Sequence, residues 1–175
     1  MSLLDTPLWE VIRGSFAPEI WARILPAILE TMYMTLISSL ITLLFGLILG
    51  ILMTATSPDG LIPLKVLYTG AGWLINGLRS LPQMVMIILM IPVARLLFGK
   101  SYGVNACILA IAASCIPMYA RIVESSLLEA GKGKIEAAQS IGSTNRQIIF
   151  SILLPETLPS LIRGFTVAMI AIISM

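Results

Sequence analysis

Long apolar runs separated by short polar segments dominate the pattern of this chain. The clearest run covers residues 27–53, a second covers residues 104–128, and a third begins at residue 158 and is still apolar at Met175. A helix needs about 20 predominantly apolar residues to cross the hydrocarbon of a bilayer. With a fourth, interrupted run at residues 64–98, the pattern predicts an all-α polytopic membrane protein with about four transmembrane helices, the last of them incomplete.

The run at residues 64–98 is too long for one upright span, and polar side chains interrupt it. Because Pro82 has no backbone N–H to donate, we expect a tilted or interfacial first half and then a break near Pro82. Backbone outside a helix is tolerated at membrane depth only beside protein or a water-filled cavity. The polar side chains near the break are therefore candidates for lining a translocation path: Asn76, Arg79, Ser80 and Gln83.

The spacing and charge of these four side chains bear on whether they line a path. Asn76, Ser80 and Gln83 are separated by four and then three residues, which on a single helix places them on one face. An arginine at the centre of a bilayer costs about 2.5–3.5 kcal/mol on insertion scales. Arg79 therefore either lines a path or extends its long side chain to the headgroups, and the sequence leaves both alternatives open.

The first 26 residues differ from the rest of the chain. They mix acidic and basic residues with two tryptophans, which is typical of a segment at a membrane interface. Pro7, Pro18 and Pro26 are expected to prevent one long helix there. We therefore expect an N-terminal interfacial segment at residues 1–26 and a transmembrane domain at residues 27–175.

Two pairs of residues within the spans predict a helix contact and a helix end. Gly46 and Gly50 form a GxxxG pattern, which lets two helices approach closely, and we favour packing within this chain over a dimer contact. Arg121 and Glu124 lie three residues apart and share a helix face. We expect this charged pair to mark the point where its span leaves the lipid.

The composition supports a membrane protein and excludes several other functions. Of the 175 residues, 58% are apolar and 11% are charged, whereas a soluble domain has about 25% charged residues. The chain has no histidine, so it lacks the commonest acid–base group and metal ligand. The net charge is only +2, without a basic stripe, and no nucleic-acid partner is expected.

Residues 94–101 fit a loosened P-loop pattern in which Ala94 replaces the first glycine. A nucleotide-binding P-loop follows a strand and forms a glycine-rich cradle around phosphate. Here the interior of the pattern is bulky and apolar, and it ends a predicted membrane helix. We therefore expect no nucleotide site, no bound cofactor and no catalytic residue in this chain itself.

The distribution of lysine and arginine predicts an orientation in the membrane. If residues 54–80 and 121–157 share a side, that side carries six of these residues and the other side carries four. An excess of positive residues marks the cytoplasmic side. We therefore expect the polar segment after residue 131 to be cytoplasmic and the N-terminus to lie outside.

That polar segment has the local signals of two helices joined by a corner. A short helix is predicted over about residues 134–141, and Gly142 suits the left-handed conformation that ends a helix. Thr144 is predicted to cap a second helix, with Gln147 completing a capping box. We expect this second helix to end at Pro155.

The side chains of the first short helix suit the docking of a partner. Ala137 and Ala138 are small enough for close approach, and Ile135 and Ile141 offer apolar anchors. Glu136 lies in the first turn, where a carboxylate interacts favourably with the helix dipole. Glu136 therefore serves either docking or only the helix end, and these residues alone leave both open.

A wider motif carries a family resemblance. It reads Glu136-Ala137-Ala138, three residues, Gly142, nine residues, Ile152, one residue and Leu154-Pro155. This motif resembles the EAA loop of ABC importer permeases at every fixed position. The resemblance implies that the segment is a cytoplasmic coupling helix that docks on a separate ATPase subunit through Glu136, Ala137, Ala138, Gly142, Ile152, Leu154 and Pro155.

Within that family the chain looks most like the permease subunits of methionine importers. The residues that carry this likeness lie at 79–82, 90–92, 95, 120–124, 127–129, 154–156 and 158–159. Such permeases usually have five spans, so the resemblance implies that one more span follows those predicted here. It also implies transport by alternating access through a homodimeric pore in the bacterial cytoplasmic membrane.

The same resemblance implies a set of partners. Two cytoplasmic ATP-binding subunits would use ATP and Mg²⁺, and an extracytoplasmic substrate-binding protein or lipoprotein would deliver the substrate. Two other functions are compatible with the residues: a permease for polar amino acids, and a non-transport membrane scaffold that only recruits a cytoplasmic partner. Polar side chains facing a common cavity would favour transport over a scaffold.

Overall fold

The computed structural model describes Trp9, residues 18–131 and residues 133–174. Helices account for the regular structure of these residues: α2 (Pro18–Thr56), α3 (Lys65–Ser80), α4 (Gln83–Phe98), α5 (Val104–Gly131), α6 (Lys134–Ser140), α7 (Asn145–Gln147), the π-helical segment η1 (Ile148–Leu153) and α8 (Leu154–Ile173). Within these described residues, three continuous helical stretches are long and apolar enough to cross a membrane, or four if the bent pair α3 and α4 counts as one span. The predicted all-α polytopic architecture is confirmed.

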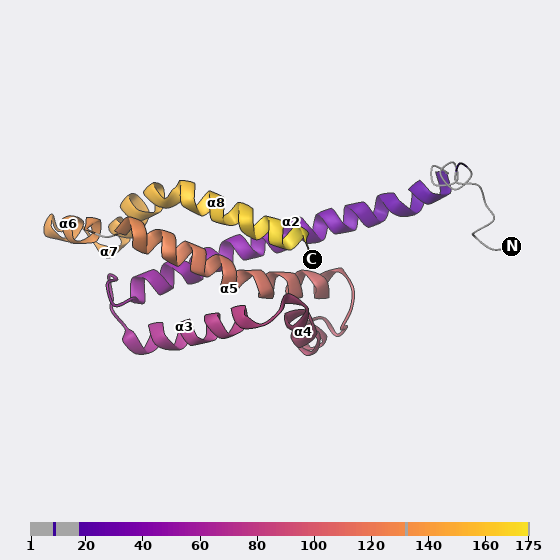
Figure 1. The fold of residues 1–175 in the computed structure, drawn as a ribbon, viewed down its shortest axis with the longest axis horizontal. Coiled ribbons are helices and arrows are strands. Elements are labelled where there is room, and N and C mark those ends of the chain that lie inside the picture. Colours follow the sequence, from indigo (N-terminus) through magenta and orange to yellow (C-terminus); the bar gives the residue numbers. More distant parts are fainter. Residues whose placement is uncertain (1–8, 10–17, 132, 175) are drawn as a thin grey trace.

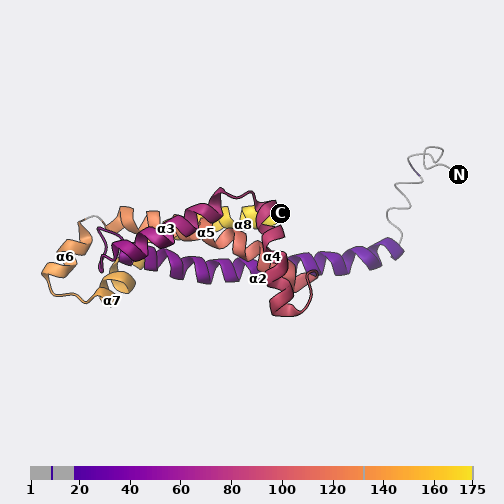
Figure 2. The same cartoon turned by 90° about the horizontal axis from the view of Figure 1, so that it is seen from below.

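The helices form an elongated bundle with α5 at its centre. Helix α5 packs against α2, α3, α4 and α8, and the short helices α6 and α7 extend beyond the end of the bundle where α2 finishes (Figure 1). Helix α4 lies across the long axis rather than along it (Figure 2). The turn after α2 and the α6–α7 segment therefore share one end of the molecule, as the predicted topology requires.

Close packing of α2 on α5 explains the GxxxG pattern. A Cβ atom added to Gly46 would lie 2.7 Å from Cδ1 of Tyr119, and one added to Gly50 would lie 2.5 Å from the Val123 side chain. No ordinary side chain fits at these separations, so the two glycines set the distance between α2 and α5. Packing within this chain, the interpretation that we favoured, is confirmed.

Pro26 does not interrupt the first helix. Helix α2 covers Pro18–Thr56, 39 residues, and continues through Pro26, so the expectation that Pro26 prevents a long helix is wrong. Pro18 is the first described residue of this helix. Pro26 removes one backbone bond near the beginning of a long apolar run, a loss that membrane helices tolerate. Residues 1–8 and 10–17 of the expected interfacial segment lie outside the described part of the chain.

The break near Pro82 is confirmed, and it separates residues that we expected to share a face. Helices α3 and α4 meet at 112°, because Leu81 and Pro82 are extended, with ψ values of 134° and 142°. A residue that precedes proline is disfavoured in the helical region. Gln83 therefore begins a different helix from that of Asn76 and Ser80, and the single-face prediction is wrong for Gln83.

The second helix of the polar segment does not end at Pro155, contrary to our prediction. Helix α7, the π-helical segment η1 and α8 follow one another without a break, and Pro155 stands in the first turn of α8. The missing N–H of this proline falls where the wider π-helical turns give way to α-helical ones, so it does not terminate the helix. The end of the polar segment is thus continuous with the last span.

Candidate functional site

The polar segment between α5 and η1 folds as a helix, a corner and a second helix. Gly133 precedes α6 with a φ of 80°, and Gly142 follows it with a φ of 79°. The N–H groups of Gly142 and Ser143 donate to the carbonyls of Gln139 and Ala138, both at 3.0 Å. This pair of bonds is the Schellman arrangement, in which glycine favours the left-handed position. The predicted glycine stop is confirmed.

The corner is closed by the predicted capping box at Thr144. The Thr144 N–H donates to Oε1 of Gln147 at 2.9 Å, and the Gln147 N–H donates to Oγ1 of Thr144 at 3.5 Å. These reciprocal bonds satisfy two donors at the start of α7 that would otherwise have no helical partner. We call residues 133–147 the coupling segment from here on.

Contacts from one face of α6 fix the coupling segment to two spans. Ala138 is 4% exposed and belongs to the same buried cluster as Leu127 of α5 and Leu153 of η1. Ile135 packs against this cluster, so the expectation that Ile135 anchors a partner is wrong. Lys134 forms an ion pair with Glu156 in the first turn of α8. A displacement of α6 would therefore move α5 and α8 with it.

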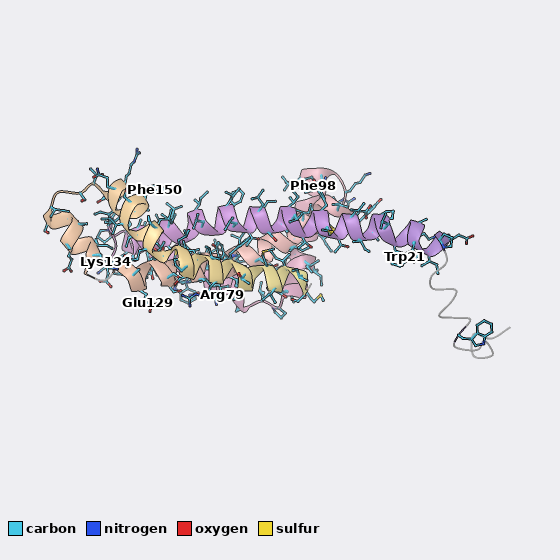
Figure 3. All side chains as sticks on the ribbon, turned by 90° about the horizontal axis from the view of Figure 1, so that it is seen from above. Trp21, Arg79, Phe98, Glu129, Lys134 and Phe150 are labelled. Atoms are coloured by element: carbon cyan, nitrogen blue, oxygen red, sulfur yellow. The ribbon has the colours of Figure 1, made fainter. Side chains whose placement is uncertain are left out.

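The opposite face of α6 is free to contact a partner. Glu136, Ala137 and Gly142 are exposed, and Ile141 keeps 80% of its surface exposed at the tip of the molecule. Phe150, labelled in Figure 3, also points outward near this end and is 61% exposed. The tip therefore exposes small, acidic and apolar side chains on which the docking prediction rests.

The structure divides the residues of the motif between two tasks. Glu136, Ala137 and Gly142 lie on the exposed tip, whereas Ala138 is buried and Ile152 and Leu154 pack against the cluster that fixes α6. Pro155 is exposed at the start of α8. The motif residues that the sequence assigns to docking thus fall into two groups. One group forms the exposed surface, and the other packs beneath it and holds it in position.

A second polar region lies between α3 and α5, about halfway along the bundle. Nη1 of Arg121 lies 2.6 Å from Oε2 of Glu124, and Nε of Arg121 donates to Oδ1 of Asn76 at 3.2 Å. Glu124 is 2% exposed, and Tyr68 of α3 lies within interaction range of both charged groups. That Arg121 and Glu124 mark the exit from lipid stays a prediction, and helix α5 itself continues to Gly131, about 15 Å further.

Beside this cluster lies an open groove of about 490 Å³, lined by Asn76, Arg79, Arg121, Ile122 and Ser125. Two of the four predicted path residues, Asn76 and Arg79, therefore face a common cavity. Ser80 is exposed and donates to the Gly77 carbonyl at 2.7 Å, and Gln83 lies beyond the bend. Sequence reasoning missed Arg121 and Ser125 as groove residues, although a charged residue within an apolar run was the available signal.

The structure also bears on the loosened P-loop pattern. Residues 94–98 are the last turns of α4, and residues 99–103 form the turn that follows. A P-loop follows a strand, whereas this pattern begins within helix α4. Within residues 18–131 and 133–174, no group of three or more Cys, Asp or Glu side chains is placed to hold a metal ion.

Comparison with known proteins agrees with this arrangement. Residues 46–175 match the family described as binding-protein-dependent transport system inner membrane components. The methionine import system permease protein MetP of Bacillus subtilis (strain 168) is 46% identical over 155 residues, which cover 89% of this chain and 68% of that protein. The D-methionine transport system permease protein MetI of Escherichia coli (strain K12) is 35% identical over 156 residues, which cover 89% and 71%.

The three-dimensional likeness has the same extent. A chain from the inward-facing MetNI methionine ABC transporter, in its CY5 native crystal form, superimposes with a TM-score of 0.86 at 33% sequence identity and covers 91% of this chain and 74% of that one. This chain belongs to the family of binding-protein-dependent transport system inner membrane components.

Proposed function

We propose that this chain is the membrane-spanning permease subunit of an ATP-driven importer that takes up methionine. The observation that carries the proposal is the coupling segment, a capped helix–corner–helix whose inner face is fixed to α5 and α8 and whose outer face is exposed. A permease driven by a separate ATPase needs such a rigid contact to receive work from that partner. The names of the relatives supply the substrate class.

In this proposal two cytoplasmic ATP-binding subunits contact the coupling segments of two permease copies. ATP and Mg²⁺ are used by those subunits, and an extracytoplasmic binding protein or lipoprotein delivers the substrate. Closure of the ATPases draws the two α6 helices together, and hydrolysis resets them. Because Ala138 and the Lys134–Glu156 pair tie α6 to the spans, little of this displacement is lost before it reaches α5 and α8.

In this proposal the protein is located in the bacterial cytoplasmic membrane, with the coupling segment inside the cell and the N-terminus outside. The groove between α3 and α5 favours transport over a scaffold, since a protein that only recruits a partner needs no polar cavity within its spans. A permease for polar amino acids stays the alternative, because the coupling segment itself carries no information about the substrate.

Uptake by the reconstituted complex tests the proposal. The full chain would be placed in proteoliposomes with the ATPase subunit and binding protein of the same organism, and accumulation of radiolabelled methionine would be followed with and without ATP. We expect ATP-dependent uptake that unlabelled methionine suppresses and that histidine and glutamine do not. Suppression by histidine or glutamine instead would favour the alternative, and complete absence of ATP-dependent uptake would reject the importer.

A further inference from the structure

Within the described part of the chain, one positive charge of the groove between α3 and α5 has no ion-pair partner. Arg121 is paired with Glu124, but neither ion pair in the described part of the chain involves Arg79. Arg79 lines the same groove as Arg121. Two arginines and one carboxylate leave the region with a surplus of one positive charge, which suits a ligand group carrying a single negative charge.

The place of this surplus in the fold is unusual. Arg79 lies about 21 Å along α3 from Lys65, and Arg121 lies about 15 Å from the end of α5. Both helices are long and apolar enough to cross a membrane, α5 alone and α3 together with α4 as a bent pair. Figure 3 shows Arg79 between the end of the molecule that carries Lys134 and the end that carries Trp21. Charged side chains on membrane-spanning helices are rare, and those that occur face the bundle interior or a cavity and mark substrate pathways.

We propose that this groove binds the α-carboxylate of the transported amino acid, with Arg79 as the principal contact. The inference rests on the proposed importer function and adds the group of the substrate that is recognised within the membrane. Arginine presents its donors in a planar fork that matches a carboxylate. Arg121 adds positive potential at the same place, and its bond to Asn76 holds the two walls of the groove together.

The groove also has room and an acceptor for the rest of an amino acid. Its volume of about 490 Å³ lies within the 300–1,000 Å³ range of small-molecule sites. Ser125 donates its hydroxyl proton to the Ile122 carbonyl at 3.0 Å, so its oxygen remains able to accept from an ammonium group. Ile122 supplies an apolar wall for a side chain.

Photo-crosslinking tests the site directly. A diazirine analogue of methionine would be irradiated with the complete permease–ATPase complex in nanodiscs, and labelled peptides would be identified by mass spectrometry. We expect label on α3 or α5. Methionine should suppress the labelling. Methioninol has an alcohol in place of the carboxylate and loses a charge-assisted contact, so the concentration of methioninol needed for the same suppression should be higher by roughly tenfold or more. Equal competition by methioninol, or no label on either helix, would overturn the proposal.

Substitutions sharpen the same experiment. Arg79→Gln is expected to lower labelling and uptake by roughly tenfold or more, and Arg79→Lys should retain part of both. Arg95→Gln is the matched control, because Arg95 lies in the last turn of α4 and does not line the groove. Unchanged labelling of Arg79→Gln would also overturn the proposal.

Failure of the site and failure of the importer are distinguishable. If wild-type proteoliposomes take up methionine but the groove is not labelled, the importer stands and the carboxylate site is rejected. If no ATP-dependent uptake occurs at all, the importer itself is rejected. Affinity capture of the ATPase by every variant separates a loss of substrate contact from a loss of assembly. The comparison of methionine with methioninol uses the wild-type protein, so it does not depend on whether a variant folds.

Discussion

The coupling segment and the groove are both polar regions in an apolar chain, yet they are built in opposite ways. The coupling segment is formed by residues close together in sequence, through a glycine stop and a capping box within residues 133–147. The groove depends on Asn76 and Arg121, which lie 45 residues apart and meet only because α3 packs on α5. A local structure is readable from its own residues, whereas a site made by packing exists only in the assembled bundle.

The largest expected effect separates docking from substrate contact. Glu136→Lys reverses a charge on the exposed tip without touching the groove. Unfavourable charge contacts across an interface cost several kcal/mol, so association with the ATPase should weaken by roughly a hundredfold or more. Gly142→Asp should act in the same direction. Affinity capture and uptake are the measurements.

Photo-labelling of the groove provides the control for these variants. If the two regions act independently in substrate binding and docking, the diazirine analogue should still label α3 or α5 of Glu136→Lys. Normal ATPase association and uptake in the Glu136→Lys variant would contradict the docking role of the exposed tip.

Removing the buried carboxylate next to the groove should have the next largest effect. Glu124→Leu leaves Arg121 without its ionic partner, and breaking a buried pair from one side typically costs 3–5 kcal/mol. Because Arg121 is 22% exposed toward the groove, we expect a loss of about 3 kcal/mol. Thermal unfolding of the complex in detergent measures it.

A double substitution tests whether the loss comes from the unpaired charge. Arg121→Leu combined with Glu124→Leu removes both charges and should recover much of the stability. If the single variant Glu124→Leu unfolds at the wild-type temperature, the pair does not contribute to the stability of the bundle in the way expected.

A smaller effect is expected from filling the contact between α2 and α5. A Cβ on Gly50 would lie 2.5 Å from the Val123 side chain and 2.8 Å from the Ala120 carbonyl oxygen. Gly50→Ala should therefore destabilise the bundle by about 1–3 kcal/mol through overpacking. The matched control is Gly70→Ala on α3, where an added Cβ meets nothing within 4 Å. Equal melting temperatures for the two variants would show that α2 and α5 are not in tight contact.

The smallest expected effect is confined to the coupling segment. Thr144→Ala removes the hydroxyl that accepts from the Gln147 N–H, and loss of such a cap typically costs about 1 kcal/mol. Hydrogen exchange at the amides of residues 145–147 should quicken, while exchange in α3 stays unchanged. Thr144→Ser keeps the hydroxyl and should behave as wild type. An equal change in α3 would mean that the coupling segment is not a locally determined unit.

The sequence by itself determined the spans and the helix ends and caps of the coupling segment. Apolar runs, the break at Pro82, the stop at Gly142 and the cap at Thr144 each depend on neighbouring residues and on backbone preferences that act over a few positions. The motif residues were found for the same reason, because their spacing is a local property of the chain.

Tertiary structure alone decided which polar residues meet. Packing of α3 on α5 brings Asn76, Arg79 and Arg121 to one groove. The 112° bend between α3 and α4 places Gln83 on a different helix, and it does not line that groove. The cluster around Leu153 decided that Ile135 packs inward, and the structure shows helix α2 running through Pro26. Side-chain periodicity gives the faces of a helix but not its neighbours, since contacts between distant residues follow from how whole helices pack.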